Sequence, residues 1–279
     1  MEALRILGAD AARGLATALA RHEGIALAGT FGTVDGILGK FLAGEPCDIV
    51  ILTHAQVAQL TARNRVGLDL VSDLGAVRDS LAERERATVY TVALKAGTAR
   101  AEAHAFALHL ADGATAMART AAGFEGAAIR RATVADSAAA RDLVFAILKE
   151  YGFTPEPQGT DADLADLDAG FLADGGLFDV AVEPDGSLVA CCGMKILAGG
   201  RLELRKMYVR RDRRGQGLGR RLLDRALAWA RARDYPRVEL ETATRLEEAI
   251  ALYRKAGFVP RPGRPDTCRC DLAFVLELR

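Results

Sequence analysis

The sequence lacks the features that would direct it to a membrane or out of the cell. Among its 279 residues no apolar run is long enough to span a bilayer, and the N-terminus has no basic segment followed by an apolar stretch. The 37 basic and 37 acidic residues give no net charge, so no overall field draws the chain to nucleic acid or to lipid. We therefore expect a cytoplasmic protein whose partners include neither a membrane nor nucleic acid.

Cysteine and histidine are scarce. Five cysteines are an odd number for a disulfide framework, so reduced thiols are expected. Cys268 and Cys270 form a C-x-C pair, but no second Cys or His cluster lies near them, which favours structural thiols over a metal site. The last of the four histidines is His109, so the second half of the chain has no histidine to serve as a base.

The length predicts two α/β domains. Small residues at 121–128 are typical of a linker, and we place the domains at residues 1–124 and 125–279. In the first domain, apolar runs alternate with segments of helical spacing in the order β-α-β-α-β-α, which favours a parallel sheet covered by helices. Thr88–Leu94 predicts one more strand, and residues 100–120 predict one or two helices.

In the second domain a glycine-rich turn joins a predicted strand at 202–209 to a predicted helix at 217–233. Gly215, Gly217 and Gly219 lack the Cβ atoms that would obstruct a tight turn. A turn that opens a helix aims several backbone N–H groups at one point, and the helix dipole adds positive charge there, so the turn can bind a pyrophosphate. An ordinary helix start is the alternative. The predicted elements are strand 129–132, helices 138–151 and 161–172, hairpin 177–197, strand 202–209, helix 217–233, strand 238–242, helix 246–256 and strand 270–278.

With these elements in this order, residues 127–279 resemble the GNAT superfamily of N-acetyltransferases. The family motif has Arg or Gln, two variable residues, Gly, one variable residue and Gly or Ala, and Arg214, Gly217 and Gly219 fill it. Arg237–Thr242 resembles the family's fifth strand, and Ala249–Phe258 resembles its last helix with a Gly-Phe ending. The resemblance implies an α+β fold around a mixed central sheet, and acetyl-CoA as acyl donor with no metal.

The resemblance also implies a site in which the strand pairs with the pantetheine arm and the turn holds the pyrophosphate. Thr242 or Thr244 stands where the family often has Asn. Arginines between 210 and 221 fit a nucleic-acid patch too, but the diphosphate turn and the zero net charge favour the cofactor. The implied cofactor-binding residues are Met207, Tyr208, Val209, Arg214, Gly215, Gln216, Gly217, Leu218, Gly219, Arg220 and Thr242.

Two catalytic residues follow from the same resemblance. Tyr253 stands where the family commonly has the general acid, and a phenol with a pKa of about 10 suits a departing thiolate; a packed aromatic is the alternative. Glu203 stands at a position where some family members have a general base, and an orienting role is the alternative for it. Glu239, Glu241 or a water chain are the other candidates for the base. No cysteine lies beside an obvious base, so direct attack by a primary amine in a ternary complex is favoured. An amino acid or another small metabolite is the expected acceptor, with a protein amine as the alternative.

The first domain resembles, more faintly, the opening lobe of molybdate-type solute-binding proteins. Ala9–Leu15, Gly29–Thr33 and Leu42–Leu52 carry the resemblance, and Val89–Gly97 looks like the segment that returns from a second lobe, which is missing here. One lobe leaves an open face where two would enclose a ligand.

Three roles for this lobe stay open: a structural support, a dimerisation surface that would make the protein a homodimer, and a regulatory ligand site. The last role is the basis of an alternative function, a metabolite or oxyanion sensor with a weak or inactive acetyltransferase domain. The residues of that ligand site would be Asp10, Ala11, Thr30 and Thr33.

Overall fold

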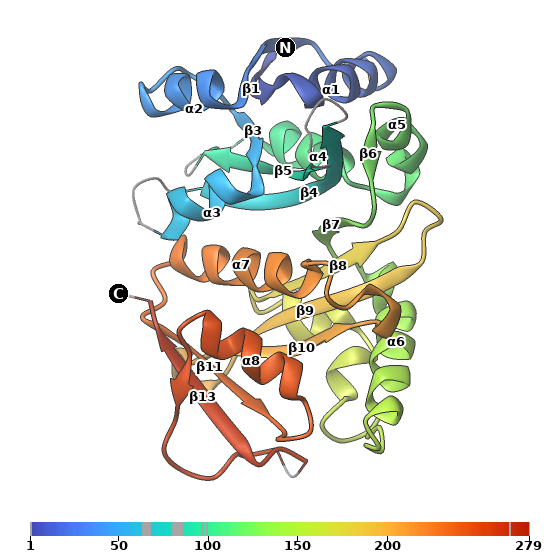
Figure 1. The fold of residues 1–279 in the computed structure, drawn as a ribbon, viewed down its shortest axis with the longest axis vertical. Helices are drawn as coiled ribbons and strands as arrows, with labels where there is room; N and C mark the ends of the chain where they lie inside the picture. Colours follow the sequence, from blue (N-terminus) through green and yellow to red (C-terminus); the bar gives the residue numbers. More distant parts are fainter. Residues whose placement is uncertain are drawn as a thin grey trace. The chain divides into compact units, whose positions relative to one another are not determined.

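The structure of the chain is a computed structural model that describes residues 2–62, 68–79, 86–95, 98, 100–267 and 269–278. The chain forms two compact units, each with its own strands and helices (Figure 1). One unit contains Met1–Arg130 and Val182–Ser187, and the other contains Arg131–Ala181 and Leu188–Arg279. No helix among the described residues is long and apolar enough to cross a membrane.

Three parallel strands begin the first unit. β1 (Leu4–Ala9) lies between β2 (Leu27–Gly32) and β3 (Ile49–Thr53), and both neighbours run in the same direction as β1. α1 (Asp10–His22) and α2 (Val34–Leu42) make the crossovers that parallel pairing requires. The alternation of apolar runs and helical segments predicts this part of the fold correctly.

The rest of this sheet is antiparallel, so the prediction of a parallel sheet is wrong beyond β3. β5 (Arg86–Lys95) runs antiparallel to β3 and to β4 (Leu68–Asp79), and β4 also pairs with the short strands β6 (Phe124–Glu125) and β7 (Ala128–Arg131). Residues 80–85 are too few for the crossover that a parallel β4–β5 pair would need. The sequence does not predict β4, because three aspartates and an arginine interrupt its apolar residues.

Helices cover both faces of the sheet, because alternate residues of each strand point to opposite faces. Ile49 and Ile51 of β3 share a hydrophobic core with α1 and α4 (Ala101–His109), and α5 (Ala116–Ala121) packs against that core. α2 and α3 (His54–Ala62) pack against β1, β3 and β5 from the other face.

The predicted linker at residues 121–128 belongs to the core of the first unit. Phe124 is 2% exposed, and its ring centre lies 6.0 Å from that of Tyr90 in an edge-to-face arrangement. Ala128 is fully buried. The boundary between the units therefore follows Arg130 and not residue 124, because these side chains add apolar area to the first core.

The second unit has a mixed sheet in the order β8-β9-β10-β11-β13-β12. β10 and β11 are parallel and are joined through a helix, whereas β9 is antiparallel to β10, and β13 is antiparallel to β11 and β12. The mixed sheet confirms the expected fold class of this part of the chain. The strands are β8 (Leu177–Val182), β9 (Leu188–Ile196), β10 (Leu202–Val209), β11 (Arg237–Thr242), β12 (Val259–Pro260) and β13 (Leu272–Glu277).

Helices lie on both faces of this sheet as well. α7 (Leu218–Arg231) and α8 (Glu247–Lys255) cover one face, and α6 (Ser137–Glu150) covers the other (Figure 1). Asp179 and Phe178, successive residues of β8, point to opposite faces. Asp179 meets Arg225 of α7, while the Phe178 ring packs 4.9 Å from that of Phe171, on the α6 side.

The predicted helix at 161–172 is instead a 3-10 turn (Ala162–Leu164) followed by a single π turn (Asp168–Leu172). The chain folds back on itself here, and a Cβ at Gly170 would lie 2.2 Å from the Asp163 carbonyl oxygen. A straight helix cannot make this contact. The fold-back holds Asp163 beneath the sheet, 4% exposed at its side chain.

Asp179 is expected to be essential for the stability of the second unit. Its carboxylate accepts hydrogen bonds from Arg225 Nε at 2.9 Å and Arg131 Nε at 3.1 Å, and the Arg225 side chain is 1% exposed. Asp179→Ala removes the carboxylate that these two arginines share and should destabilise the unit by about 3–5 kcal/mol. Urea unfolding followed by the fluorescence of Trp229, the single tryptophan, reports on this unit.

Asp174→Ala is the matched control, because Asp174 is exposed. It should change the unfolding free energy by no more than about 0.5 kcal/mol. Equal unfolding midpoints for the two variants would show that the Asp179 ion pairs contribute nothing.

Candidate functional site

A cleft opens in the second unit where β10 and β11 part. Along these two fully described strands, pairing occurs at two positions only, Glu203 with Glu239 and Leu204 with Leu240. Beyond Leu204 the strands diverge, so the N–H and C=O groups on that side of β10 have no sheet partner in β11. This strip of backbone can pair with an extended ligand.

A bulge in β10 shapes the floor of the cleft. The register between β10 and β9 shifts between Arg205 and Tyr208, and Lys206 has a φ of 52°, a left-handed conformation that is uncommon for lysine. The buried Lys206 Nζ donates to the Thr160 carbonyl at 2.8 Å and to Asp161 Oδ1 at 2.5 Å. These contacts stabilise the bulge from the far side of the sheet.

Asp161 ties the bulge to the segment before β13. Arg269 donates to both oxygens of Asp161, and the N–H of Glu156 donates at 2.9 Å. Burial alone would raise the pKa of Asp161, but the hydrogen bonds from Arg269, the backbone and Lys206 hold it well below its usual range. Asp161 is therefore a buried anion with four donors.

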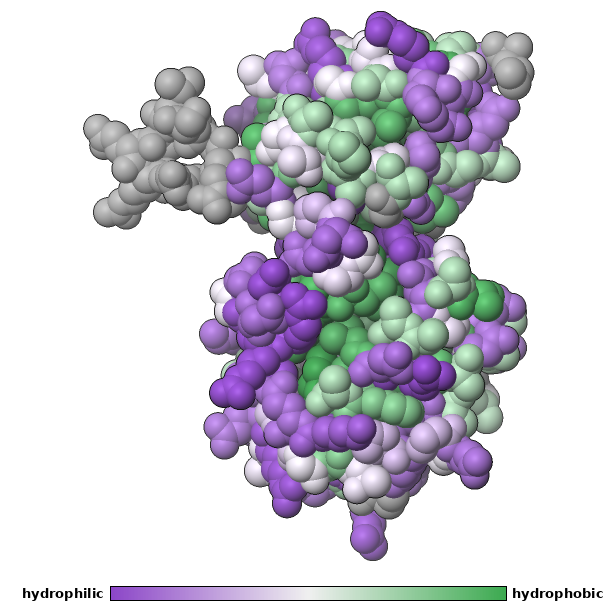
Figure 2. Space-filling model, turned by 90° about the vertical axis from the view of Figure 1, so that its right-hand side faces the viewer, coloured by the Kyte–Doolittle hydropathy of each residue, from purple (hydrophilic) through white to green (hydrophobic). Residues whose placement is uncertain are grey.

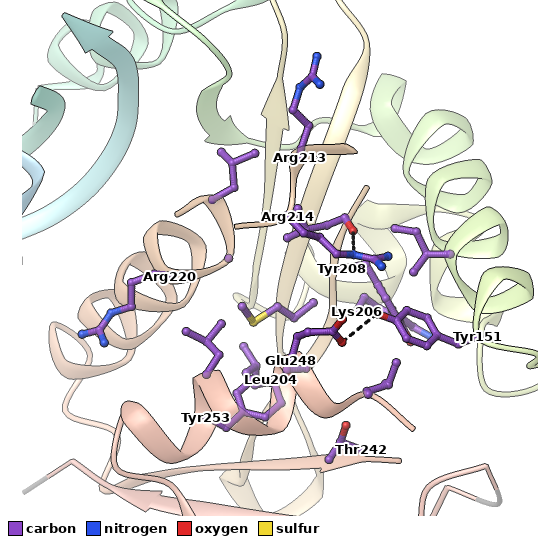
Figure 3. Close-up of a pocket in the computed structure, with 18 of the residues that line it drawn as sticks. Tyr151, Leu204, Lys206, Tyr208, Arg213, Arg214, Arg220, Thr242, Glu248 and Tyr253 are labelled. Carbon is purple, nitrogen blue, oxygen red and sulfur yellow. Dashed lines mark hydrogen bonds between the residues drawn. The ribbon is translucent and has the colours of Figure 1, made fainter. Parts of the chain in front are cut away.

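The first cavity, of about 450 Å³, lies along the free side of β10. Its walls are Leu204–Val209, the end of α6, the turn before α7 and one side of α8 (Figure 3). Figure 2 shows hydrophobic residues in a hollow of this unit with hydrophilic residues around it. An apolar passage with polar groups at its ends suits a long ligand with a charged terminus.

The glycine turn forms the charged end of this cavity. Gly215 and Gly217 have φ angles of 75° and 81°, which only glycine adopts easily, and Gly217 is the N-cap of α7. A Cβ at Gly219 would lie 3.4 Å from Leu252, so α7 packs closely against α8. The first N–H groups of α7 have no acceptor within the helix and point out of its positive end. The turn is therefore suited to a diphosphate.

Arg214 braces the turn. Its Nε donates to the Val209 carbonyl at 2.9 Å, and its two terminal nitrogens donate to the carboxylate of Glu150 at 2.7 and 3.2 Å. The guanidinium carbon also lies 5.0 Å from the centre of the Tyr151 ring. Arg214 thus connects the end of β10, the turn and the end of α6.

The structure gathers the predicted cofactor residues around this one cavity, with the exception of Gln216, whose amide donates to the Asp212 carbonyl at 3.0 Å. Thr242, at the end of β11, is 4% exposed and lines the cavity. Arg220 also lines it, and its guanidinium is paired with Asp224 at 2.8 Å.

Sequence reasoning missed a contact between the walls of the cavity. The hydroxyl of Tyr151, after α6, donates to Glu248 Oε2 at 3.1 Å, near the start of α8 (Figure 3). The two residues are 97 positions apart, and neither belongs to a motif, so no pattern in the sequence signals the pair.

Tyr253 of α8 lies in the wall of the first cavity. It is 6% exposed, and its ring centre lies 5.8 Å from that of Phe258. Burial raises the pKa of Tyr253 far above its ordinary value, because the phenolate would be poorly solvated. The phenol is therefore protonated at neutral pH, and it is a weaker acid than the expected phenol with a pKa of about 10.

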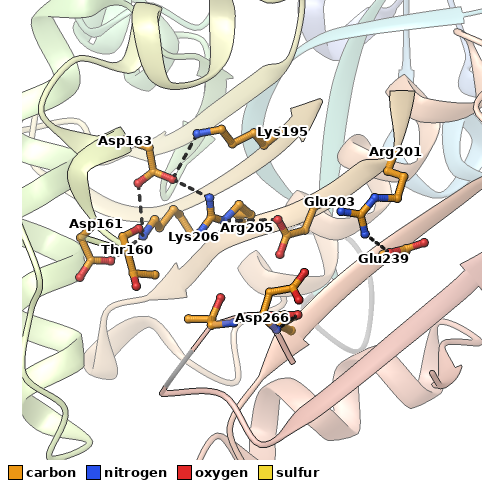
Figure 4. Close-up of polar contacts among 12 residues, drawn as sticks. Thr160, Asp161, Asp163, Lys195, Arg201, Glu203, Arg205, Lys206, Glu239 and Asp266 are labelled. Atoms are coloured by element: carbon orange, nitrogen blue, oxygen red, sulfur yellow. Dashed lines mark hydrogen bonds and ion pairs between the residues drawn. The ribbon is translucent and has the colours of Figure 1, made fainter. Parts of the chain in front are cut away.

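A second cavity, of about 510 Å³, adjoins the first. The two share Arg205 and Glu241, so they meet where β10 and β11 part. The charged residues that line the second cavity are Arg201, Glu203, Arg205, Glu239, Glu241, Arg261 and Asp266. Figure 4 labels Arg201, Glu203, Arg205, Glu239 and Asp266.

The three strand carboxylates of the second cavity are held differently. Glu239 lies 3.1 to 4.0 Å from three arginines, and Glu241 accepts backbone N–H bonds from Asp266 and Thr267 at 2.6 and 2.9 Å. Glu203 has a looser contact, 3.6 Å from Arg205 Nε. Burial raises the pKa of Glu203, with Glu241 adding to the rise. Of the three, Glu203 is the carboxylate best placed to accept a proton.

The described residues contain no group of three His, Cys, Asp or Glu side chains that could hold a metal ion. The described cysteines are Cys47, Cys191, Cys192 and Cys270, and all four have free thiols; Cys268 of the C-x-C pair lies outside the described residues. Burial raises the pKa of Cys191 to about 12.

Comparison with known proteins agrees with this geometry. Residues 142–258 match the model of the acetyltransferase (GNAT) family. The chain is 36% identical over 135 residues to the N-acetyltransferase YjgM of Escherichia coli K12, a protein described as uncharacterized, and the alignment covers 47% of the chain and 80% of YjgM. It is also 38% identical over 96 residues to the IAA acetyltransferase of Azospirillum brasilense, covering 34% of the chain and 63% of that protein.

A solved structure shares the fold. An acetyltransferase of the GNAT family from Staphylococcus aureus Mu50 superposes with a TM-score of 0.51 at 20% sequence identity, covering 54% of this chain and 98% of that structure. The matched relatives, the parted strands and the glycine turn lead to one conclusion. The chain belongs to the GNAT family of acetyltransferases.

Proposed function

We propose that the second unit transfers the acetyl group of acetyl-CoA to the primary amine of a small molecule. The observation that carries this proposal is the meeting of two cavities where β10 and β11 part. The first cavity has the diphosphate turn at one end, and the second contains Glu203. An acyl donor in the first and an amine in the second would bring the reacting atoms together at the gap between the strands.

Residues of the first cavity would hold the donor. The N–H groups at the start of α7 would bind the pyrophosphate, and the free side of β10 would pair with the pantetheine arm. Backbone N–H groups near Met207 and Tyr208, turned by the bulge at Lys206, would stabilise negative charge on the thioester oxygen.

Two side chains would move protons during transfer. Glu203 would take a proton from the acceptor ammonium, directly or through water, so that the neutral nitrogen can bond to the acetyl carbon. As the C–S bond breaks, Tyr253 would give its proton to the departing thiolate sulfur. Burial raises the pKa of Glu203 and so strengthens it as a base, and it keeps the Tyr253 phenol protonated until a thiolate forms beside it.

Direct transfer is favoured over an acyl-enzyme. Cys191 and Cys192 are fully buried, and burial raises the pKa of each thiol well above its ordinary value. A thiolate is the nucleophile in acyl-enzyme chemistry, and such thiols do not form one at neutral pH.

The second cavity favours an amine that also carries an anionic group. Its carboxylates would attract an ammonium, and Arg201, Arg205 and Arg261 would attract a carboxylate. An amino acid has both groups, and for this reason we propose amino acids or related small metabolites as acceptors.

For the first unit we propose a supporting role. The parallel order β2-β1-β3 with helices on both faces supports its likeness to one lobe of a solute-binding protein. A single lobe leaves a ligand exposed to solvent. The sensor alternative is not favoured, because the family of the second unit is one of acetyltransferases.

Turnover tests the proposal. The purified full chain, given acetyl-CoA and a panel of amino acids, diamines and amino sugars, should release free CoA with at least one amine. The matched control is the N-acetylated form of that amine, which has no nucleophilic nitrogen and should release none. Absence of CoA release with every amine would contradict the proposed activity.

Tyr253→Phe should lower kcat on the order of 10²-fold, because the leaving thiolate loses its proton donor. The Kd for acetyl-CoA, measured by calorimetry, should stay the same. Tyr235→Phe is the matched control, because Tyr235 stacks on Trp229 and does not line either cavity. An unchanged kcat for Tyr253→Phe would remove Tyr253 from the mechanism.

Gly217→Ala should weaken acetyl-CoA binding about tenfold, because a Cβ at a φ of 81° strains the turn by about 1–3 kcal/mol. Gly186→Ala places the same strain at a φ of 85° in the turn after β8, outside both cavities. Calorimetric Kd values for acetyl-CoA should change only for Gly217→Ala. An equal Kd for both variants would contradict the role of the glycine turn.

A further inference from the structure

Arg205 lies between two carboxylates and is nearer to one of them, although neither contact is a hydrogen bond. Its terminal nitrogen NH1 lies 3.2 Å from Asp163 Oδ2, whereas its Nε lies 3.6 Å from Glu203 Oε2 (Figure 4). The side chains of Arg205, Asp163 and Glu203 are 19%, 4% and 13% exposed, so water screens these contacts weakly.

The longer contact leaves Glu203 without a full ion pair. An arginine can bind a carboxylate through two parallel N–H bonds at about 2.7–2.9 Å, and such a pair would make the carboxylate a poor base. The contact at 3.6 Å lies beyond hydrogen-bond distance.

Asp163 is held in place by other cations. Lys206 Nζ lies 3.3 Å from Asp163 Oδ1, and Lys195 Nζ lies 3.9 Å from Asp163 Oδ2. The fold-back at Gly170 fixes the backbone of Asp163 as well. Asp163 is therefore a buried carboxylate with three cations around it, although neither of its oxygens accepts a hydrogen bond from the described residues, and Arg205 is the side chain that links it to Glu203.

We propose that Asp163 is a positioning residue: by drawing the Arg205 guanidinium toward itself, it leaves Glu203 loosely paired and able to take a proton from the acceptor amine. The inference rests on the proposed role of Glu203 as the base. Asp163 lines neither cavity, and in this proposal it sets the basicity of Glu203.

The other charged groups near Glu203 have partners of their own. Arg201 and Arg261 lie beside Glu239, and Glu241 is bound to the backbone of residues 266 and 267. The remaining groups that face this region are Asp266 in the lining of the cavity and Cys270 before β13. Burial and the carboxylates of Glu241 and Asp163 raise the pKa of Glu203, while Arg205 and Arg201 lower it.

A titration of Glu203 in the full chain tests the inference without any substrate. In protein labelled with ¹³C at the side-chain carboxyl carbon of glutamate, the Glu203 signal is the one that Glu203→Gln removes. Asp163→Asn should free Arg205 to pair with Glu203 and lower the midpoint of its titration by about one pH unit. Arg205→Gln should raise the midpoint.

The double variant separates the action through Arg205 from a direct effect of the Asp163 charge. In the Arg205→Gln background, Asp163→Asn should shift the midpoint much less than it does alone. An unchanged midpoint in Asp163→Asn, or a full shift in the Arg205→Gln background, would overturn the inference. Trp229 fluorescence checks folding, and Asp163→Ser replaces Asp163→Asn if that variant does not fold.

Kinetics then separate this inference from the proposed function. With acetyl-CoA and the best amine of the panel, the pH at which kcat/KM rises should be lower in Asp163→Asn, by the same amount as the midpoint of the Glu203 titration. The plateau value of kcat/KM should fall several-fold, because Glu203 is then a weaker base. If the midpoint moves and the pH profile does not, Glu203 is not the base, while the control of its charge by Asp163 stands. If the midpoint does not move, the inference fails, whatever Glu203→Gln does to turnover.

Discussion

The divergence of two parallel strands is the constraint on which the site depends. β10 and β11 pair at only two positions, Glu203 with Glu239 and Leu204 with Leu240, and the two cavities meet just beyond these pairs. On one side the bulge at Lys206 turns the backbone into the first cavity, and on the other side Glu203 enters the second. The missing ladder hydrogen bonds between β10 and β11 leave the opening at which the two cavities meet.

Keeping such a gap open requires contacts from behind it. Asp161 binds Lys206 and Arg269 at once, and so fastens the bulge in β10 to the segment that leads into β13. Arg214 does the same at the other end, where it joins the glycine turn to Glu150 of α6. These ion pairs join residues that are far apart in the sequence and in direct contact in the fold. They replace, at the edges of the cleft, the rigidity that sheet hydrogen bonds supply elsewhere.

The sequence predicts the parts of the site that are local. The glycine turn and the strand before it are contiguous in the sequence, so their spacing alone predicts a diphosphate site at the turn. The environment of Glu203 is not local: Asp163 and Arg205 meet because the chain folds back at Gly170, and no spacing of residues encodes that meeting. In the first unit the same distinction holds. The alternating pattern predicts β1, β2 and β3, but the charged residues of β4 obscure its strand pattern. Phe124 lies among small residues typical of a linker, and only the structure shows that it packs against Tyr90.

Arg205 and Glu241 belong to the walls of both cavities. A side-chain movement that admits one substrate therefore changes the wall that the other substrate meets. If the donor and the acceptor bind in these cavities as proposed, the factor by which the donor alters the affinity for the acceptor equals the factor by which the acceptor alters the affinity for the donor. Arg205 and Glu241 are the residues through which such coupling would act.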